Sequence, residues 1–225
     1  MSRERERRVV VAAAAGIGVR LVQAVGSFLT VPIVLHALDQ AGFGVWGAAT
    51  SLAWLAAFAD FGVGNALITL VARAVARGET EAARQDLAAA LSFACLLALL
   101  LGAIGVGLVL LTAPGPLAAP YLIAVAGLAV NIPLSIANNL WWGLQRGHLA
   151  SLWDTVQTLC MIALTYLAAF LHGHVLAFTG LVFGSILLSN GGSLCHVLLT
   201  HPELRPACWR HALAGIVRIG RSGSL

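Results

Sequence analysis

Residues Leu87–Leu111 read LAAALSFACLLALLLGAIGVGLVLL and contain no charged side chain. An α-helix needs about 20 consecutive apolar residues to cross the hydrocarbon core of a bilayer, so this stretch predicts a transmembrane helix. The rest of the chain is similar in character: 60% of its 225 residues are hydrophobic, 10% are charged, and its mean hydropathy is +0.92. Soluble domains carry about 25% charged residues. The sequence therefore predicts an all-α integral membrane protein.

Further apolar runs of comparable length are separated by short polar or Pro/Gly-rich connections. Together they predict a bundle of about six transmembrane helices: Val9–Leu35, Phe43–Val71, Leu87–Leu111, Tyr121–Trp142, Leu152–Leu171 and Val175–Leu199. Pro133 is expected to kink the fourth of these helices. We expect residues 1–200 to form one bundle, and residues 201–225 to form a basic cytoplasmic tail leading toward a seventh helix that this sequence lacks. The charged start also fits a signal peptide, although Glu4 and Glu6 are unusual there and no clear cleavage site follows.

The arginines predict how these helices are oriented in the membrane. The chain contains 13 arginines and no lysine. With a cytoplasmic N-terminus, every arginine except Arg20 falls at the cytoplasmic ends of the helices. Because cytoplasmic loops of membrane proteins are enriched in arginine and lysine, both termini are expected to be cytoplasmic. The arginines form no basic stripe interleaved with aromatic residues, which argues against a nucleic-acid partner.

Polar side chains recur at helical spacing inside four spans, where an unpaired polar group costs several kcal/mol. The stripes are Arg20, Gln23, Ser27 and Thr30; Asn131, Ser135, Asn138, Asn139 and Trp142; Asp154, Gln157, Thr158 and Thr165; and Ser185, Ser189, Ser193 and His196. The span over Leu87–Leu111 is nearly bare of polar groups and is expected to face lipid or to pack. Serine and threonine can simply join helices by hydrogen bonds, whereas charged residues in a span usually mark a pathway or an ion pair.

Arg20 and Asp60 are the charges that lie deepest in the predicted spans. Each lies the same number of residues from the cytoplasmic end of its helix, so the two are expected at similar depth and within reach of each other. The pair could orient the arginine for an anionic ligand. An ion pair that only fixes helix packing would explain Asp60 equally well.

No enzyme, metal or cofactor site is expected from the sequence. It contains no metal-ligand cluster, nucleophile motif or phosphate-binding glycine loop, and its loops are too short to build an active site. His172 and His174 offer only a two-ligand fragment, for which an ordinary loop is the simpler interpretation. The four cysteines, Cys95, Cys160, Cys195 and Cys208, form no CxxC pair and are interpreted as packing residues.

Four local motifs resemble a known family: LDQAGFGVW at 38–46, DFGVGNAL at 60–67, ARAVARGE at 72–79 and GLQR at 143–146. In order and in predicted topology they are similar to the N-terminal region of bacterial polysaccharide flippases of the O-antigen type. These flippases belong to the multidrug/oligosaccharidyl-lipid/polysaccharide exporter superfamily. Asp39 departs from the pattern, because the family more often has glycine at that position.

The resemblance implies a transporter that moves an undecaprenyl-diphosphate-linked oligosaccharide to the periplasmic leaflet of the bacterial inner membrane. Its relatives pair two six-helix bundles across a cavity, and only the first bundle is expected here. The implied partners are the lipid-linked oligosaccharide, membrane lipids, and a second half-transporter or a second copy of the chain. The candidate substrate-binding residues are Arg20, Gln23, Asp60, Asn65, Asn131, Asn138, Asn139, Asp154 and Gln157.

Two other interpretations remain open. One is a lobe of a multidrug exporter driven by sodium or protons, for which Asp60 and Asp154 would be the intramembrane carboxylates. The other is a membrane scaffold or an inactive fragment that transports nothing.

Overall fold

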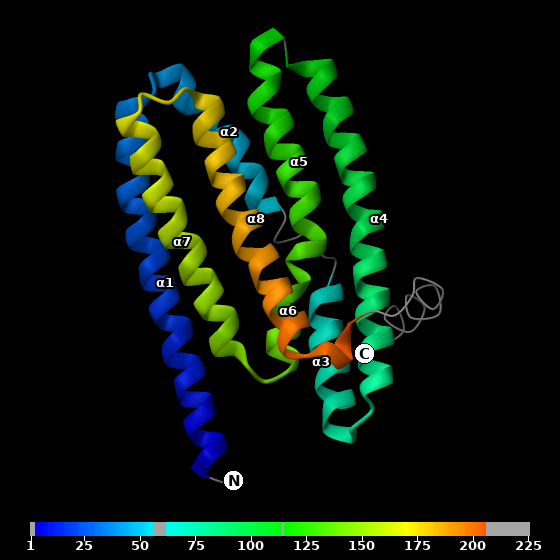
Figure 1. Cartoon of the computed structure of the whole chain (residues 1–225). Helices are drawn as coiled ribbons and strands as arrows, with labels where there is room; N and C mark the ends of the chain where they lie inside the picture. Colours follow the sequence, from blue (N-terminus) through cyan, green and yellow to red (C-terminus); the bar gives the residue numbers. More distant parts are fainter. Residues whose placement is uncertain (1–2, 56–61, 114, 206–225) are drawn as a thin grey trace.

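The chain folds as a bundle of long helices in a computed structural model that describes residues 3–55, 62–113 and 115–205 (Figure 1). Its α-helices are α1 (Arg3–Ala37), α2 (Gln40–Leu55), α3 (Val63–Arg77), α4 (Thr80–Thr112), α5 (Ala118–Leu134), α6 (Ile136–Gly143), α7 (Gly147–Phe170) and α8 (Val175–Thr200). Two 3₁₀ turns, η1 (Gly115–Leu117) and η2 (Pro202–Leu204), precede α5 and follow α8. The predicted all-α bundle is confirmed.

Within the described residues, five helical stretches are long and apolar enough to cross a membrane: Gly16–Ala37, Thr80–Thr112, Ala118–Gly143, Gly147–Phe170 and Val175–Thr200. The predicted span over Phe43–Val71 differs, because it is divided between α2 and α3. Gly62 stands immediately before α3 with a φ of 80°, a left-handed conformation that glycine adopts more readily than other residues. The sequence predicted one continuous helix here because the stretch is apolar throughout most of its length.

The predicted kink in the fourth span is present. The helix is interrupted at Ser135, which separates α5 from α6. Pro133 has no backbone N–H to donate to the preceding turn, so the helix is weakened at this point. The short α6 that follows packs against α3, α7 and α8.

The arginine-bearing connections lie at the same end of the bundle. Figure 1 places the start of α1, the α3–α4 connection, the α6–α7 connection and η2 together at its lower end. These segments carry Arg73, Arg77, Arg146 and Arg205. We call this side the arginine end; which compartment it faces stays a prediction.

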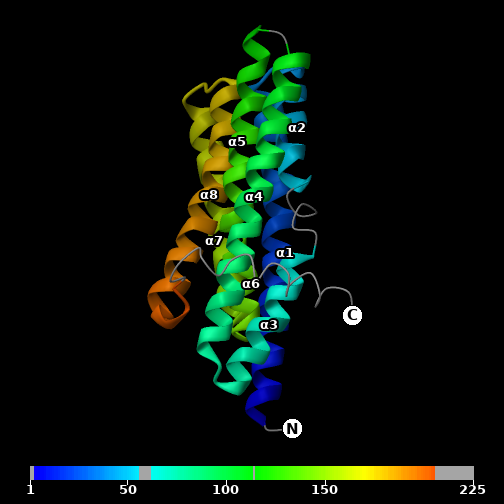
Figure 2. The same cartoon turned by 90° about the vertical axis from the view of Figure 1, so that its right-hand side faces the viewer.

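The helices are arranged so that sequence neighbours are not always spatial neighbours. α1 packs along α7, α7 packs against α8, and α5 lies between α4 and α8. In Figure 2 α8 follows one edge of the bundle, α1, α2 and α3 follow the other, and α4 and α5 lie toward the viewer. The exposed face of α4 carries leucines such as Leu99 and Leu111, at 73% and 85% exposure, as expected for a face that contacts lipid.

The serine stripe of α8 joins helices. Ser185, Ser189 and Ser193 are at most 2% exposed. The Ser189 hydroxyl donates to the backbone carbonyl of Trp153 on α7 (2.7 Å), and the Ser193 hydroxyl accepts from the indole of Trp141 on α6 (3.1 Å). Here the interpretation of serine as a link between helices is correct.

Residues 206–225 of the predicted tail lie outside the described part of the chain. Before them, Leu204 in η2 is 2% exposed and belongs to the same core cluster as Ala83 and Leu87 of α4. The His201 side chain hydrogen-bonds Glu203 at 2.9 Å, which lowers the pKa of Glu203 below its ordinary value. The chain after α8 is therefore held against the arginine end of α4.

Candidate substrate-binding site

The short helix α6 has one buried face and one open face. Ile136, Ala137, Leu140 and Trp141 are buried against the bundle. Asn138 and Asn139 are half-buried on the opposite side, and Trp142, three to four residues later, is 44% exposed. Residues four apart share one face of a helix, so the Asn138 amide and the Trp142 indole lie on the same side of α6.

Asn138 lies against the first turns of α7. Its side-chain Nδ2 donates to Oδ1 of Asp154 at 3.3 Å, and both residues are half-buried. Its own amide oxygen is buried and finds no donor among the described residues. The Asn138 side chain thus joins α6 to α7.

Arg20 completes this group from α1. Small contacts let α1 approach α7, since a Cβ built on Gly26 would lie 3.0 Å from the Thr158 methyl group. Arg20 is exposed, and its charge attracts the Asp154 carboxylate. Their nitrogen and oxygen atoms do not come within 4.0 Å, so no ion pair between described residues occupies the guanidinium donors. We call Arg20, Asn138 and Asp154 the Arg20 cluster.

Two predicted glutamines lie next to this cluster. Gln23 follows Arg20 by three residues on α1, and Gln157 follows Asp154 by three residues on α7. Both are half-buried, and neither side chain forms a hydrogen bond in the described part of the chain. Together with the open face of α6, they supply uncommitted amide donors and acceptors.

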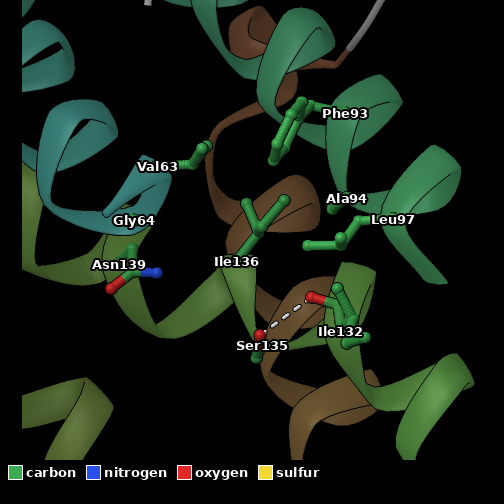
Figure 3. A pocket seen from close by; sticks show the side chains of 9 residues that line it. All are labelled: Val63, Gly64, Phe93, Ala94, Leu97, Ile132, Ser135, Ile136 and Asn139. Atoms are coloured by element: carbon green, nitrogen blue, oxygen red, sulfur yellow. Dashed lines mark hydrogen bonds between the residues drawn. The ribbon is translucent and has the colours of Figure 1, made fainter. Parts of the chain in front are cut away.

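Asn139 points away from the Arg20 cluster, toward α3 and α4. Figure 3 shows its side chain beside Gly64, in a small cavity closed by Phe93, Leu97 and other apolar side chains. The cavity volume of about 20 Å³ has room for roughly one water. It is too small and too apolar for a glycan. Asn65, next to Gly64, is exposed on α3.

The remaining predicted residues fall into two groups. Asn131 accepts a hydrogen bond of 2.6 Å from Asn190, which ties α5 to α8 away from the open face of α6. Asp60 lies outside the described residues, so its contact with Arg20 stays a prediction. Asn190 was not among the predicted residues, although an asparagine within an apolar span was a usable signal.

Comparison with protein families matches residues 11–199 to the family described as polysaccharide biosynthesis protein. The chain belongs to this family. A comparison with curated protein sequences gave no match. The expected place in the exporter superfamily is thereby confirmed at the level of the family.

The fold of this polysaccharide biosynthesis family member is similar to two solved transporters of the MOP superfamily. One comes from Pyrococcus furiosus, and its description reports a binding pocket of reversed polarity; the TM-score is 0.71 at 16% identity. The other is a multidrug resistance MATE family transporter in an outward-facing conformation, with a TM-score of 0.73 at 15% identity. In both cases 96% of this chain is covered and 52% of the other, so the chain spans about half the length of these transporters.

Proposed function

We propose that this chain is one lobe of a transporter that moves a diphosphate-linked, lipid-anchored oligosaccharide across the bacterial inner membrane. The observation that carries the proposal is the Arg20 cluster: an exposed guanidinium within a membrane span, beside a carboxylate that it does not contact directly. Placing a charge in a span costs at least about 2.5–3.5 kcal/mol, so such residues usually serve a pathway or a ligand.

The guanidinium suits a diphosphate headgroup. It presents a fixed fork of N–H donors, keeps its charge when water is removed, and pairs with phosphate oxygens through two parallel hydrogen bonds. Asp154 acts as a counter-charge that makes Arg20 tolerable in the empty site. An arriving diphosphate replaces this long-range attraction with direct, shorter contacts, and no direct Arg20–Asp154 ion pair has to be broken first.

The amides beside the cluster suit the sugar part of the substrate. Glycan hydroxyls both donate and accept hydrogen bonds, and so do the side chains of Gln23 and Gln157. Asn65, exposed on α3, and Asp60, where the family motif places it, are further proposed contacts, whereas Asn139 faces the small apolar cavity. These groups tolerate many sugars because none of them demands a single geometry.

We place the arginine end in the cytoplasm, where the lipid-linked substrate is made available to the Arg20 cluster. A transport cavity is enclosed between two helical bundles, and this chain accounts for about half the length of the solved transporters. The proposed partner is a second half-transporter or a second copy of the chain.

Binding to the purified chain in detergent tests the headgroup assignment. Farnesyl diphosphate serves as the probe, and its affinity is measured by isothermal calorimetry. Arg20→Ala should weaken binding at least tenfold, because a charge-assisted contact is worth about 1.5–3 kcal/mol. The affinity of Arg20→Lys should lie between those of the unaltered chain and Arg20→Ala, since lysine keeps the positive charge but cannot form two parallel hydrogen bonds. Arg77→Ala, at the exposed end of α3, is the matched control and should bind normally. Unchanged affinity of Arg20→Ala overturns the proposal.

A second candidate is a lobe of a cation-coupled multidrug exporter. It is favoured by Asp154, a carboxylate within a span that is hydrogen-bonded by Asn138. The same variants separate the two functions. If an organic cation such as ethidium binds to the chain, and Asp154→Asn abolishes that binding while Arg20→Ala leaves it intact, the second candidate replaces the first.

A further inference from the structure

We infer that Trp142 is a stacking platform for the sugar ring nearest the diphosphate. The inference rests on the proposed function and adds to it a residue that recognises the sugar part of the substrate. It begins with the turn between α6 and α7, whose sequence is Trp142-Gly143-Leu144-Gln145-Arg146-Gly147.

This turn is held in an uncommon conformation. Gln145 has a φ of 58°, in the left-handed region that residues other than glycine seldom occupy. Two backbone hydrogen bonds fix it: Gln145 N–H donates to the carbonyl of Trp142 (3.0 Å), and Arg146 N–H donates to that of Trp141 (2.8 Å). The chain thus reverses direction within a few residues and begins α7 directly beside the end of α6.

The reversal brings the backbone of Gly147 against the Trp142 ring. A Cβ built on Gly147 would lie 2.4 Å from Cζ3 of that indole, closer than real side chains approach one another. Only a glycine leaves room for the ring in this position. The indole is therefore supported by backbone on one side, and it is nevertheless 44% exposed.

The exposed part of Trp142 belongs to the polar face of α6. Trp142 follows Asn138 by four residues, so the ring lies roughly 6 Å along the helix from the Arg20 cluster, toward the arginine end. Its indole N–H forms no hydrogen bond within the described residues. Trp141, the next residue on the other face, is by contrast fully buried and hydrogen-bonded to Ser193.

A supported indole beside free amides has the chemistry that recognises a pyranose. One face of the sugar presents C–H groups, whose partial positive charge is attracted by the electron-rich face of an aromatic ring. The sugar edge presents hydroxyls that the indole N–H can bond. With the diphosphate at Arg20, the first sugar lies one helical turn away, at Trp142. Trp142 shares its face of α6 with Asn138, whose amide bonds Asp154 of the Arg20 cluster.

Two probes that differ only in the sugar test the inference on the full purified chain: farnesyl diphosphate and farnesyl-diphospho-N-acetylglucosamine. The unaltered chain should bind the sugar-bearing probe more tightly. Trp142→Leu should weaken that probe roughly tenfold, the effect of one good aromatic contact, and leave the sugar-free probe within about twofold. Trp142→Phe should retain part of the difference. Gly147→Ala should abolish the difference in affinity between the two probes although the tryptophan is still present, because the added methyl group displaces its ring.

The control is Tyr166→Leu, which removes a similarly exposed aromatic side chain (48%) from the other half of α7 and should bind both probes normally. Equal binding of both probes by the unaltered chain overturns the platform and leaves the headgroup site intact. So does a Trp142→Leu variant that loses both probes alike, or neither. If the sugar-free probe is not bound, or is insensitive to Arg20→Ala, the proposed function itself fails.

Discussion

Replacing Ser193 with alanine should destabilise the bundle, because the buried indole N–H of Trp141 would lose its hydrogen-bond acceptor. The indole N–H of Trp141 donates to the Ser193 hydroxyl at 3.1 Å, and the Trp141 side chain is fully buried. The substitution removes one oxygen and little volume, so packing changes little. A buried donor without a partner costs about 1–3 kcal/mol in water-soluble proteins, and helix-joining hydrogen bonds in membranes are worth about 0.6–1.7 kcal/mol. We expect a loss of about 1–2 kcal/mol.

The chain provides a matched control for this measurement. Ser185 lies on the same face of α8 and is 1% exposed, but its hydroxyl donates only to the carbonyl of Val182 on its own helix. Ser185→Ala should therefore cost less than about 0.5 kcal/mol, because that carbonyl already accepts a helical hydrogen bond. Reversible unfolding in mixed micelles, followed by circular dichroism, gives both values. The reasoning is refuted if the two variants are equally stable, or if Trp141→Phe fails to reduce the effect of Ser193→Ala in a double-mutant cycle.

Three further outcomes are expected. Gly127→Ala should lower stability by about 1–3 kcal/mol, because its Cβ would lie 2.5 Å from the Phe183 ring, while Gly184→Ala, with open space around it, should be neutral in the same unfolding assay. Alkaline phosphatase fused into the α3–α4 connection should be inactive, and strong activity would reverse the proposed orientation. The 225-residue chain alone should not replace a full-length polysaccharide flippase in cells, and full complementation by a monomer would disprove the half-transporter proposal.

The helices were predictable because the spans are apolar, well separated and long enough to cross a bilayer. The division of the second span was not, since α2 and α3 are both apolar and only Gly62 marks the boundary. A single glycine within a membrane helix is common and carries little information by itself. The kink near Pro133 was predictable because a missing backbone donor has a local effect that needs no tertiary contact.

The candidate site was predicted in its residues more than in its contacts. Helical spacing grouped Arg20 with Gln23, and Asp154 with Gln157, correctly within each helix. Which helices face each other is set by packing, and a sequence pattern does not encode it. Asn138 and Asp154 meet because the tight turn at Gln145 folds α7 back on α6. The sequence placed Trp142 in the polar stripe of its span, but the support of its ring by the Gly147 backbone depends on the turn and was not predictable.

The packing of α1 along α7 has a consequence for how the protein is made. Arg20 and Asp154 are 134 residues apart (154 − 20). At about 5–20 residues per second, the ribosome needs roughly 7–27 s to synthesise that distance. During this interval the first helix sits in the membrane without its neighbour, and its arginine must be sheltered by lipid headgroups, water or the insertion machinery. Nascent chains that stall before α7 emerges therefore leave Arg20 without the Asp154 carboxylate that attracts it in the folded bundle.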